Sequence, residues 1–143
     1  MNTPQSIAYS VTAQSTGGRG GQAVTTDPEL TLDLRAPQEL GGPGGGANPE
    51  QLFAMGYGAC FQGAMGLAAK ELGTSTTDSV VRTTVGIGPE GDSFAISVNI
   101  EVYIPGVPRD EVQRLADRTH ELCPYSKATR GNVPVTVTAI ESL

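Results

Sequence analysis

The chain has 143 residues, a length that fits one domain spanning residues 1–143 and needs no metal or disulfide to close a core. Its net charge of −6 argues against nucleic-acid binding, which requires clustered Lys and Arg. No apolar run approaches the roughly 18 residues of a membrane span, and no export signal opens the sequence, so we expect a cytoplasmic protein that binds no membrane.

Short strands are predicted for the N-terminal third. Ile7, Tyr9 and Val11 alternate with polar residues, which predicts a strand over residues 6–14. A turn with Arg19 between pairs of glycines follows at residues 16–21. Two further strands, and then a flexible glycine-rich segment, are expected at residues 23–26, 30–34 and 41–46.

A long helix is predicted next. Asn48 is a good N-cap, Pro49 suits the first helical position and Gln51 completes a capping box. The following residues, 52–72, carry apolar side chains on nearly every face, which is typical of a buried helix. Glycines at positions 56, 58, 63 and 66 each cost about 1 kcal/mol relative to alanine, so we expect another backbone, such as a second helix, to pack closely against this one.

The C-terminal half predicts a hairpin, a helix and a closing strand. Alternating runs at residues 79–88 and 94–104 flank a turn, and residues 108–122 have the period of an amphipathic helix. Cys123-Pro124 ends that helix, because a residue before proline avoids the helical region. With a last strand at residues 133–140, the order predicts an α+β fold with antiparallel sheets around a long buried central helix.

The two cysteines are the first candidates for chemistry. In a reducing compartment a cysteine pair is more often catalytic or sensing than structural. Cys60 lies in the middle of the buried helix, where most thiols are inert, and Cys123 lies at a helix end followed by proline. The single histidine, His120, nearly eliminates histidine-based metal sites; its polar helical surroundings predict a solvated surface residue. We expect no metal and no bound cofactor.

Arg19 is the candidate for activating a thiol. Lowering the pKa of a cysteine by about two units takes roughly 2.7 kcal/mol. A guanidinium at about 4 Å supplies on the order of 4 kcal/mol at an effective dielectric near 20. One arginine suffices if a carboxylate fixes its position by bidentate pairing. Arg130 is the rival, although its position favours a role in securing the loop after Cys123.

Several motifs together resemble one family. They are Gly17-Gly18-Arg19, Glu39-Leu40-Gly41-Gly42, Asn48-Pro49-Glu50-Gln51-Leu52-Phe53, Ala59-Cys60-Phe61, Val85-Gly86-Ile87-Gly88-Pro89 and the run from Cys123 to Asn132. In this order they resemble the organic hydroperoxide resistance (Ohr) branch of the OsmC/Ohr superfamily. The segment around Cys123 is specific, because the OsmC branch shares both cysteines but typically lacks this form of it.

The resemblance implies a thiol-dependent peroxidase that reduces organic hydroperoxides in oxidative-stress defence. It implies that Cys60 is the attacking thiolate, that Cys123 resolves its oxidised form, that Arg19 holds the thiolate and that Glu50 holds Arg19. It further implies an intertwined homodimer and an external dithiol reductant of the lipoyl type, such as a lipoylated protein.

Helix geometry adds a hypothesis about Glu50. Cys60 lies ten positions beyond it, about 15 Å along a helix, so Glu50 does not readily reach its own Cys60 through one arginine. We therefore expect a composite site in which Glu50 of one chain approaches Cys60 of the other. The side chains of Leu52, Phe53, Tyr57 and Met65 either line an apolar approach for alkyl or fatty-acid hydroperoxides or belong to the core.

Two other functions stay open from the sequence. One is a dimeric carrier for an apolar ligand in which the cysteines are incidental. The other is a redox sensor coupled to a partner protein, against which the absence of a DNA-reading element counts. Catalytic consumption of hydroperoxide distinguishes the peroxidase from both.

Overall fold

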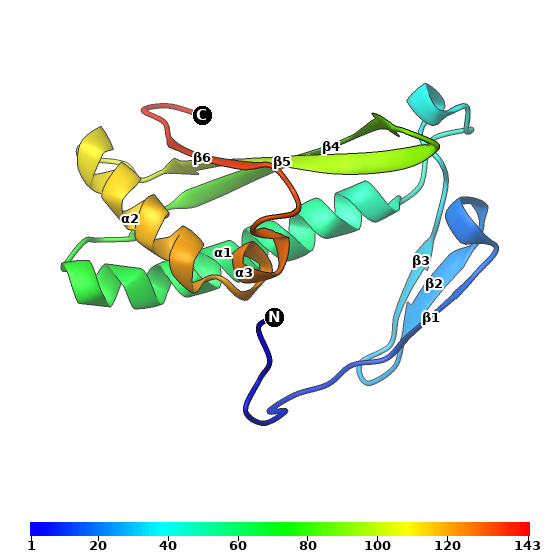
Figure 1. Ribbon diagram of the computed structural model, residues 1–143, viewed down its shortest axis with the longest axis horizontal. Helices are drawn as coiled ribbons and strands as arrows, with labels where there is room; N and C mark the ends of the chain where they lie inside the picture. Colours follow the sequence, from blue (N-terminus) through cyan, green and yellow to red (C-terminus); the bar gives the residue numbers. More distant parts are fainter. The chain divides into compact units, whose positions relative to one another are not determined.

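The computed structural model describes residues 1–143 and holds two compact units, residues 1–52 and residues 53–143. The N-terminal unit contains an antiparallel sheet of three strands in the order β1-β2-β3 (Figure 1). The strands are β1 (Ala13–Thr16), β2 (Gln22–Thr25) and β3 (Leu30–Asp33). The assignment of all 143 residues to a single domain stays a prediction.

The first predicted strand is wrong over most of its length. β1 begins at Ala13, and residues 1–12 are irregular. Ile7, Tyr9 and Val11 are 72%, 75% and 57% exposed. Alternation in the sequence predicts a strand only where a neighbouring strand accepts its hydrogen bonds, and the pairing of β1 with β2 starts at Ala13 opposite Thr25. The strands predicted at residues 23–26 and 30–34 are confirmed within one residue as β2 and β3.

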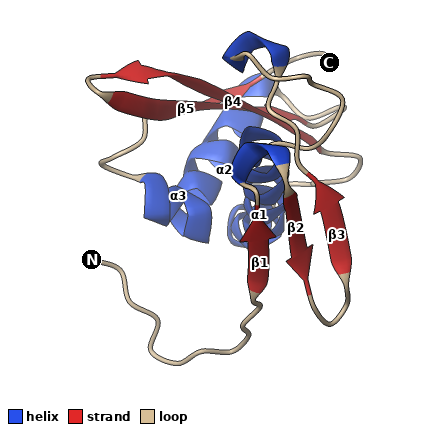
Figure 2. Ribbon diagram, turned by 90° about the vertical axis from the view of Figure 1, so that its right-hand side faces the viewer, coloured by secondary structure: helices blue, strands red, loops and turns tan.

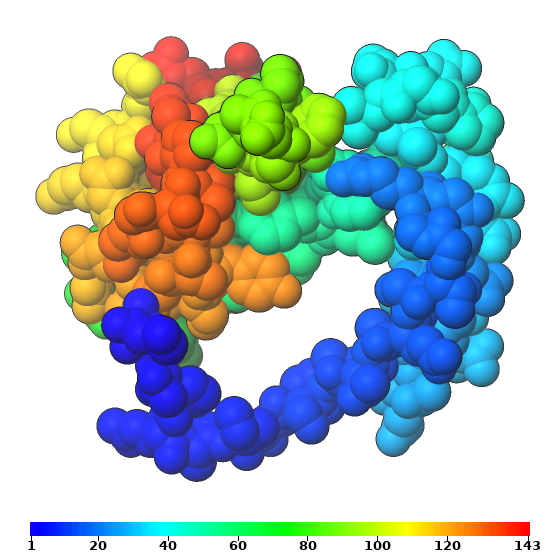
Figure 3. Space-filling view, turned by 45° about the vertical axis from the view of Figure 1, so that its right-hand side comes forward, coloured from blue at the N-terminus to red at the C-terminus, as the bar shows by residue number.

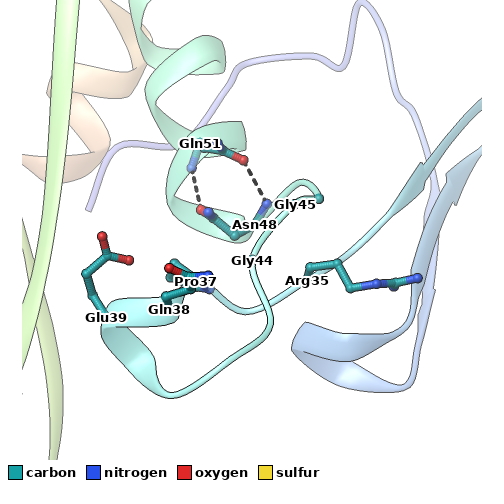
Figure 4. A pocket seen from close by; sticks show the side chains of 9 residues that line it. Arg35, Pro37, Gln38, Glu39, Gly44, Gly45, Asn48 and Gln51 are labelled. Carbon is teal, nitrogen blue, oxygen red and sulfur yellow. Dashed lines mark hydrogen bonds between the residues drawn. The ribbon is translucent and has the colours of Figure 1, made fainter.

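The glycine-rich segment before the long helix forms hydrogen-bonded turns, although the sequence predicted a flexible segment. The Gly42 and Gly44 amides donate to carbonyls of Pro37 and Ala36 at 3.0 and 2.9 Å, next to a short 3-10 helix, η2 (Gln38–Leu40). This loop and the start of the next helix line a polar pocket (Figure 4). The capping box predicted there is confirmed: Gln51 N donates to Asn48 Oδ1 at 2.9 Å and Asn48 N to Gln51 Oε1 at 3.1 Å.

Helix α1 (Pro49–Leu72) begins at this cap, as predicted, and continues into the C-terminal unit. That unit also holds a second sheet and two further helices. They are β4 (Val80–Glu90), β5 (Ser93–Tyr103), α2 (Arg109–Leu122), α3 (Pro124–Thr129) and β6 (Val135–Ala139). The sheet has the order β4-β5-β6, and the three helices lie on one of its faces (Figure 2).

One pairing in this sheet differs from the prediction of antiparallel sheets. β4 and β5 form the expected antiparallel hairpin across Gly91-Asp92, but β6 runs parallel to β5. The chain reaches β6 only after crossing the sheet through α2 and α3, and such a crossover allows a parallel neighbour where a tight turn does not. The α+β class, with two sheets and a long central helix, is confirmed.

The core of the C-terminal unit lies between the sheet and the helices. β5 turns every second side chain toward it, α1 and α2 supply most of the rest, and Ile104, Cys123 and Ala139 complete it. The largest fully buried side chains are Tyr57, Phe61, Met65, Ile100, Val102, Val112 and Leu115.

The other face of α1 is uncovered within this chain. Met55 and Leu67 are 70% and 60% exposed, so the helix is not buried on every side as its sequence predicts. α1 is also long and apolar enough to span a membrane by length and composition alone, contrary to the expectation that no run approaches that length. Helices that form protein cores meet the same test, and Tyr57 and Phe61 place one face of α1 in the core described above.

Candidate active site

The two cysteines, 63 positions apart, lie in contact. Cys123 Sγ donates a hydrogen bond to Cys60 Sγ across 3.7 Å, and both are free thiols. Cys60 is half-buried and Cys123 has no exposed surface. A disulfide bond is about 2.05 Å long, so the sulfurs need to approach by under 2 Å to bond. The resolving role that the family resemblance implies for Cys123 needs such a contact, and the role itself stays a prediction.

Cys123 is held at the joint between two helices. It is the C-cap of α2 and the N-cap of α3, and its backbone conformation is extended. Its N–H donates to Thr119 O at 2.8 Å, and its C=O accepts from Lys127 N at 2.9 Å. Pro124 ends α2, as predicted, and also begins α3, because proline suits the first position of a helix. The sulfur is therefore fixed from both sides of the joint.

Within the C-terminal unit, the surroundings of Cys60 disfavour its ionised, thiolate form. Burial raises the pKa of the Cys60 thiol, and the hydrogen bond and charge of Cys123 raise it further. The backbone N–H of Tyr125 opposes these effects, because its hydrogen bond to the sulfur lowers the pKa. Burial is the largest effect, and the pKa is raised.

Arg19 and Glu50 form a bidentate ion pair within the N-terminal unit. Arg19 Nη1 and Nη2 donate to Glu50 Oε2 and Oε1, both at 2.7 Å. The bond from Arg19 holds the pKa of the Glu50 carboxyl below its usual range. Arg19 lies on a 3-10 turn, η1 (Gly18–Gly20), and Gly17 and Gly18 have φ of 69° and 54°, a region that favours glycine. The turn predicted here thus presents the guanidinium, and the pairing implied by the family resemblance is present.

The four residues considered for substrate contact separate into two groups. Tyr57 and Met65 are fully buried core residues, whereas Leu52 and Phe53 are half-buried. Phe53 packs edge-on against Tyr57 with ring centroids 5.9 Å apart. Whether any of the four contacts a substrate stays a prediction.

Tyr125 is a site residue that the sequence analysis missed. It is 40% exposed, its ring lies 6.3 Å from that of Phe53 and 5.8 Å from that of Tyr57, and its N–H faces Cys60. A Cβ at Gly56 would lie 3.5 Å from the Tyr125 ring, so the glycine lets α1 approach it. The position directly after Cys123-Pro124 was the available signal. Figure 3 shows α3, coloured orange, at the surface of its unit.

The prediction that His120 is a solvated surface residue is wrong. Its ring is half-buried, and Nδ1 lies 2.8 Å from the buried hydroxyl of Ser126. Burial and the charge of Arg130 lower the pKa of His120, while Asp117 opposes them. Arg130 Nη2 donates to His120 O at 2.6 Å, so Arg130 secures the segment after Cys123 as the sequence favoured. No group of three His, Cys, Asp or Glu side chains is placed to hold a metal.

Fold and site together define an α+β chain whose central helix brings one cysteine against a second at a helix joint. Comparison with known proteins then identifies the family. The family model described as OsmC-like protein matches residues 42–138, and the chain belongs to this family.

Several known proteins are similar to this chain over nearly its full length. The organic hydroperoxide resistance protein of Xanthomonas axonopodis pv. citri is 46% identical over 96% of this chain and 99% of its own length. A crystal structure of an organic hydroperoxide resistance protein from Legionella pneumophila has 40% identity and a TM-score of 0.88, covering 96% of this chain and all of its own. That of OhrB from Bacillus subtilis has 38% identity and a TM-score of 0.84, over 94% of this chain and 100% of its own.

Proposed function

We propose that this protein is a two-cysteine peroxidase that reduces organic hydroperoxides to alcohols and so protects the cell against oxidative stress. The observation that carries the proposal is the 3.7 Å contact between Cys60 and Cys123. Relatives 46% identical to the chain bear the name organic hydroperoxide resistance protein, which supports this substrate class.

The reaction follows from the chemistry of two adjacent thiols. The Cys60 thiolate attacks the outer peroxide oxygen, the O–O bond breaks, and the released alkoxide takes a proton to become the alcohol. Cys60 is left as a sulfenic acid. The Cys123 thiol then attacks the Cys60 sulfur, the S–O bond breaks, and water leaves as the disulfide forms. An external dithiol, for which we propose a lipoyl-type compound or lipoylated protein, restores both thiols by exchange. The protein itself holds no cofactor in this scheme.

The thiolate needs a positive charge to form near neutral pH. Burial raises the pKa of Cys60, and the middle of a helix receives no help from the helix dipole. The guanidinium of Arg19, oriented by both oxygens of Glu50, supplies that charge in our proposal. A charge at about 4 Å is worth on the order of 4 kcal/mol at an effective dielectric near 20, more than a shift of two pKa units requires.

The site is completed in a homodimer. Because Glu50 and Cys60 are about 15 Å apart along α1, the Arg19–Glu50 pair of one protomer serves Cys60 of the other in our proposal. The uncovered face of α1 supports a helix from a second protomer as the neighbour. A Cβ at Gly63 or Gly66 would meet no atom within 4 Å in this chain, so these positions leave room for a close backbone.

The half-exposed rings beside the sulfurs favour an apolar hydroperoxide. The rings of Phe53 and Tyr125 lie 6.3 Å apart, and the N–H of Tyr125 faces the Cys60 sulfur. An alkyl or fatty-acid chain buries apolar area against these rings, at about 25 cal/mol per Å², whereas hydrogen peroxide has no such group. We therefore propose a preference for organic hydroperoxides in a cytoplasmic setting.

Turnover is the test. The protein is mixed with cumene hydroperoxide or hydrogen peroxide and with dihydrolipoamide, and hydroperoxide consumption is followed, with the Cys60→Ser variant as control. We expect many turnovers per protein with the organic substrate and at least tenfold slower consumption of hydrogen peroxide, a preference of about 1.4 kcal/mol. A single oxidation without turnover would indicate a sensor, no oxidation a carrier, and either result would overturn the proposal.

A further inference from the structure

A chain of four hydrogen-bonded side chains links the helices around the two cysteines. Tyr57 OH donates to Ser126 Oγ at 2.9 Å, Ser126 Oγ lies 2.8 Å from His120 Nδ1, and Tyr57 OH lies 3.1 Å from Thr129 Oγ1. The three residues of this series that carry a hydroxyl group are buried: Tyr57 and Ser126 are 0% exposed and Thr129 is 5% exposed. Buried hydroxyl groups of this kind need partners inside the protein.

We assign His120 Nδ1 as the acceptor in its contact with Ser126. Each hydroxyl has a single hydrogen. Because Tyr57 gives its hydrogen to Ser126, the Ser126 hydrogen is free to go to Nδ1 of a neutral imidazole, the tautomer that carries its proton on Nε2. The lowered pKa of His120 is consistent with this neutral ring. His120 is therefore the last residue of this hydrogen-bond series, and its Nδ1 accepts the Ser126 hydrogen.

The chain of bonds joins the segments that carry the reacting sulfurs. Tyr57 lies on α1 three residues before Cys60, and His120 lies on α2 three residues before Cys123. Ser126 lies on α3, three residues after Cys123. One set of bonds thus fixes the turn before each sulfur and the short helix whose Tyr125 N–H faces Cys60.

We propose that His120 is a positioning residue for disulfide formation, acting through Ser126 to hold α3 so that the Cys123 sulfur stays against Cys60. This inference rests on the proposed function and concerns its second step, in which Cys123 attacks the Cys60 sulfenic acid and water leaves. Removing the imidazole leaves the buried Ser126 hydroxyl without its acceptor, and such groups are costly. The joint then moves to satisfy Ser126, and the sulfurs separate.

The first measurement uses no hydroperoxide. Diamide oxidises two thiols to a disulfide as it is reduced to a hydrazine, so its rate with the reduced protein reports how readily the two sulfurs meet. We expect disulfide formation to be about tenfold slower in His120→Ala. His120→Asn keeps an acceptor where Nδ1 lies and should return to within about threefold of the wild type. Arg114→Ala, on the exposed side of α2, is the matched control and should keep the wild-type rate.

A double-mutant comparison tests whether His120 acts through Ser126. Ser126→Ala removes the same link and should slow disulfide formation as His120→Ala does, with the double variant little slower than either. Ser126→Ala also serves in place of His120→Ala should that variant not fold. A wild-type rate in both single variants, additive losses in the double variant, or no rescue by His120→Asn would each overturn the inference.

The hydroperoxide reaction separates this inference from the proposed function. In a Cys123→Ser background, His120→Ala should slow sulfenic acid formation on Cys60 much less than it slows disulfide formation with Cys123 present, because only the bond from the Tyr125 N–H to the Cys60 sulfur is weakened. With Cys123 present, the same substitution should let sulfinic acid accumulate under excess cumene hydroperoxide, because resolution is slow. A wild-type protein that reacts with diamide but ignores hydroperoxide would remove the proposed function, while the diamide series would still decide the role of His120.

Discussion

The Cys60–Cys123 pair and the Arg19–Glu50 ion pair are held in place in different ways. Cys60 and Cys123 meet inside one unit, where a helix joint and buried hydroxyl groups hold them. Arg19 lies on a glycine-flanked turn, 38% exposed in its side chain, and its one salt-bridge partner is Glu50. In the proposed mechanism, disulfide formation depends on residues of the buried core, whereas thiolate activation depends on a group presented by a loop. Substitutions in the two regions should therefore damage different steps.

The largest effect is expected at the sulfurs themselves. Cys60→Ser should abolish hydroperoxide reduction, because no nucleophile remains. Cys123→Ser should still consume one equivalent of hydroperoxide and stop at the Cys60 sulfenic acid, which dimedone labelling and mass spectrometry detect. Substantial turnover in Cys60→Ser would show that the roles are assigned wrongly.

Substitution of the arginine should affect activation alone. Arg19→Ala should raise the Cys60 pKa and slow its alkylation near pH 7 by about one to two orders of magnitude. Glu50→Ala should cost less, about tenfold, because the arginine remains but is less well oriented. The double variant should be little worse than Arg19→Ala, since the two residues act as one unit. Iodoacetamide rates against pH measure this. An unchanged Cys60 pKa in Arg19→Ala would remove Arg19 from the mechanism.

A smaller effect is expected on self-association. At an open helical position, Gly→Ala stabilises a helix by about 1 kcal/mol. Gly63 is open in this chain, so Gly63→Ala should instead weaken the dimer about tenfold, because the methyl group meets the partner helix in the proposed dimer. Sedimentation at decreasing concentration tests this. Gly58→Ala is the control for a clash inside one protomer, because its Cβ would lie 3.0 Å from Thr83 Oγ1 of the same chain. Tighter or unchanged dimers in Gly63→Ala would argue against this contact.

The smallest effect concerns pH and stability. Burial and Arg130 lower the His120 pKa, with Asp117 opposing, so the unfolded chain binds this proton more readily. The stability that neutral His120 contributes is therefore fully present above the ordinary histidine pKa, about 6.5. It is lost as the pH falls from there through the lower pKa of His120 in the folded protein. Urea unfolding at about pH 7.5 and 5.5 should show a decrease in wild type that is smaller in His120→Asn. An equal decrease in both would exclude His120 as its source.

The sequence predicted the elements whose signals are local. α1 has a capping box at Asn48 and a long apolar run, and the β4–β5 hairpin and α2 have clear periods. The first strand failed because alternation at Ile7 and Tyr9 does not tell whether a partner strand is present. The direction of β6 depends on the path through α3, and Cys123-Pro124 predicts the end of a helix but not the short helix that follows.

Prediction of the site was limited in the same way. The thiol pair followed from the two cysteines and from the family resemblance, and the Arg19–Glu50 pair from the resemblance alone. His120 was misjudged because its partner, Ser126, lies six residues away across the Cys123 joint, a spacing that places two residues together only if the chain turns there. Tyr125 was missed because its contact with Cys60 is made by a backbone N–H, which every residue except proline carries.

The most direct test of the central claim is a peptide map of the protein after one equivalent of an organic hydroperoxide. The reduced protein is mixed with cumene hydroperoxide, quenched with N-ethylmaleimide and digested without reductant. The account predicts a peptide pair linked by a disulfide between Cys60 and Cys123, formed in proportion to the cumyl alcohol released, and its loss after treatment with a dithiol. Two alkylated cysteines beside unconsumed hydroperoxide would contradict it.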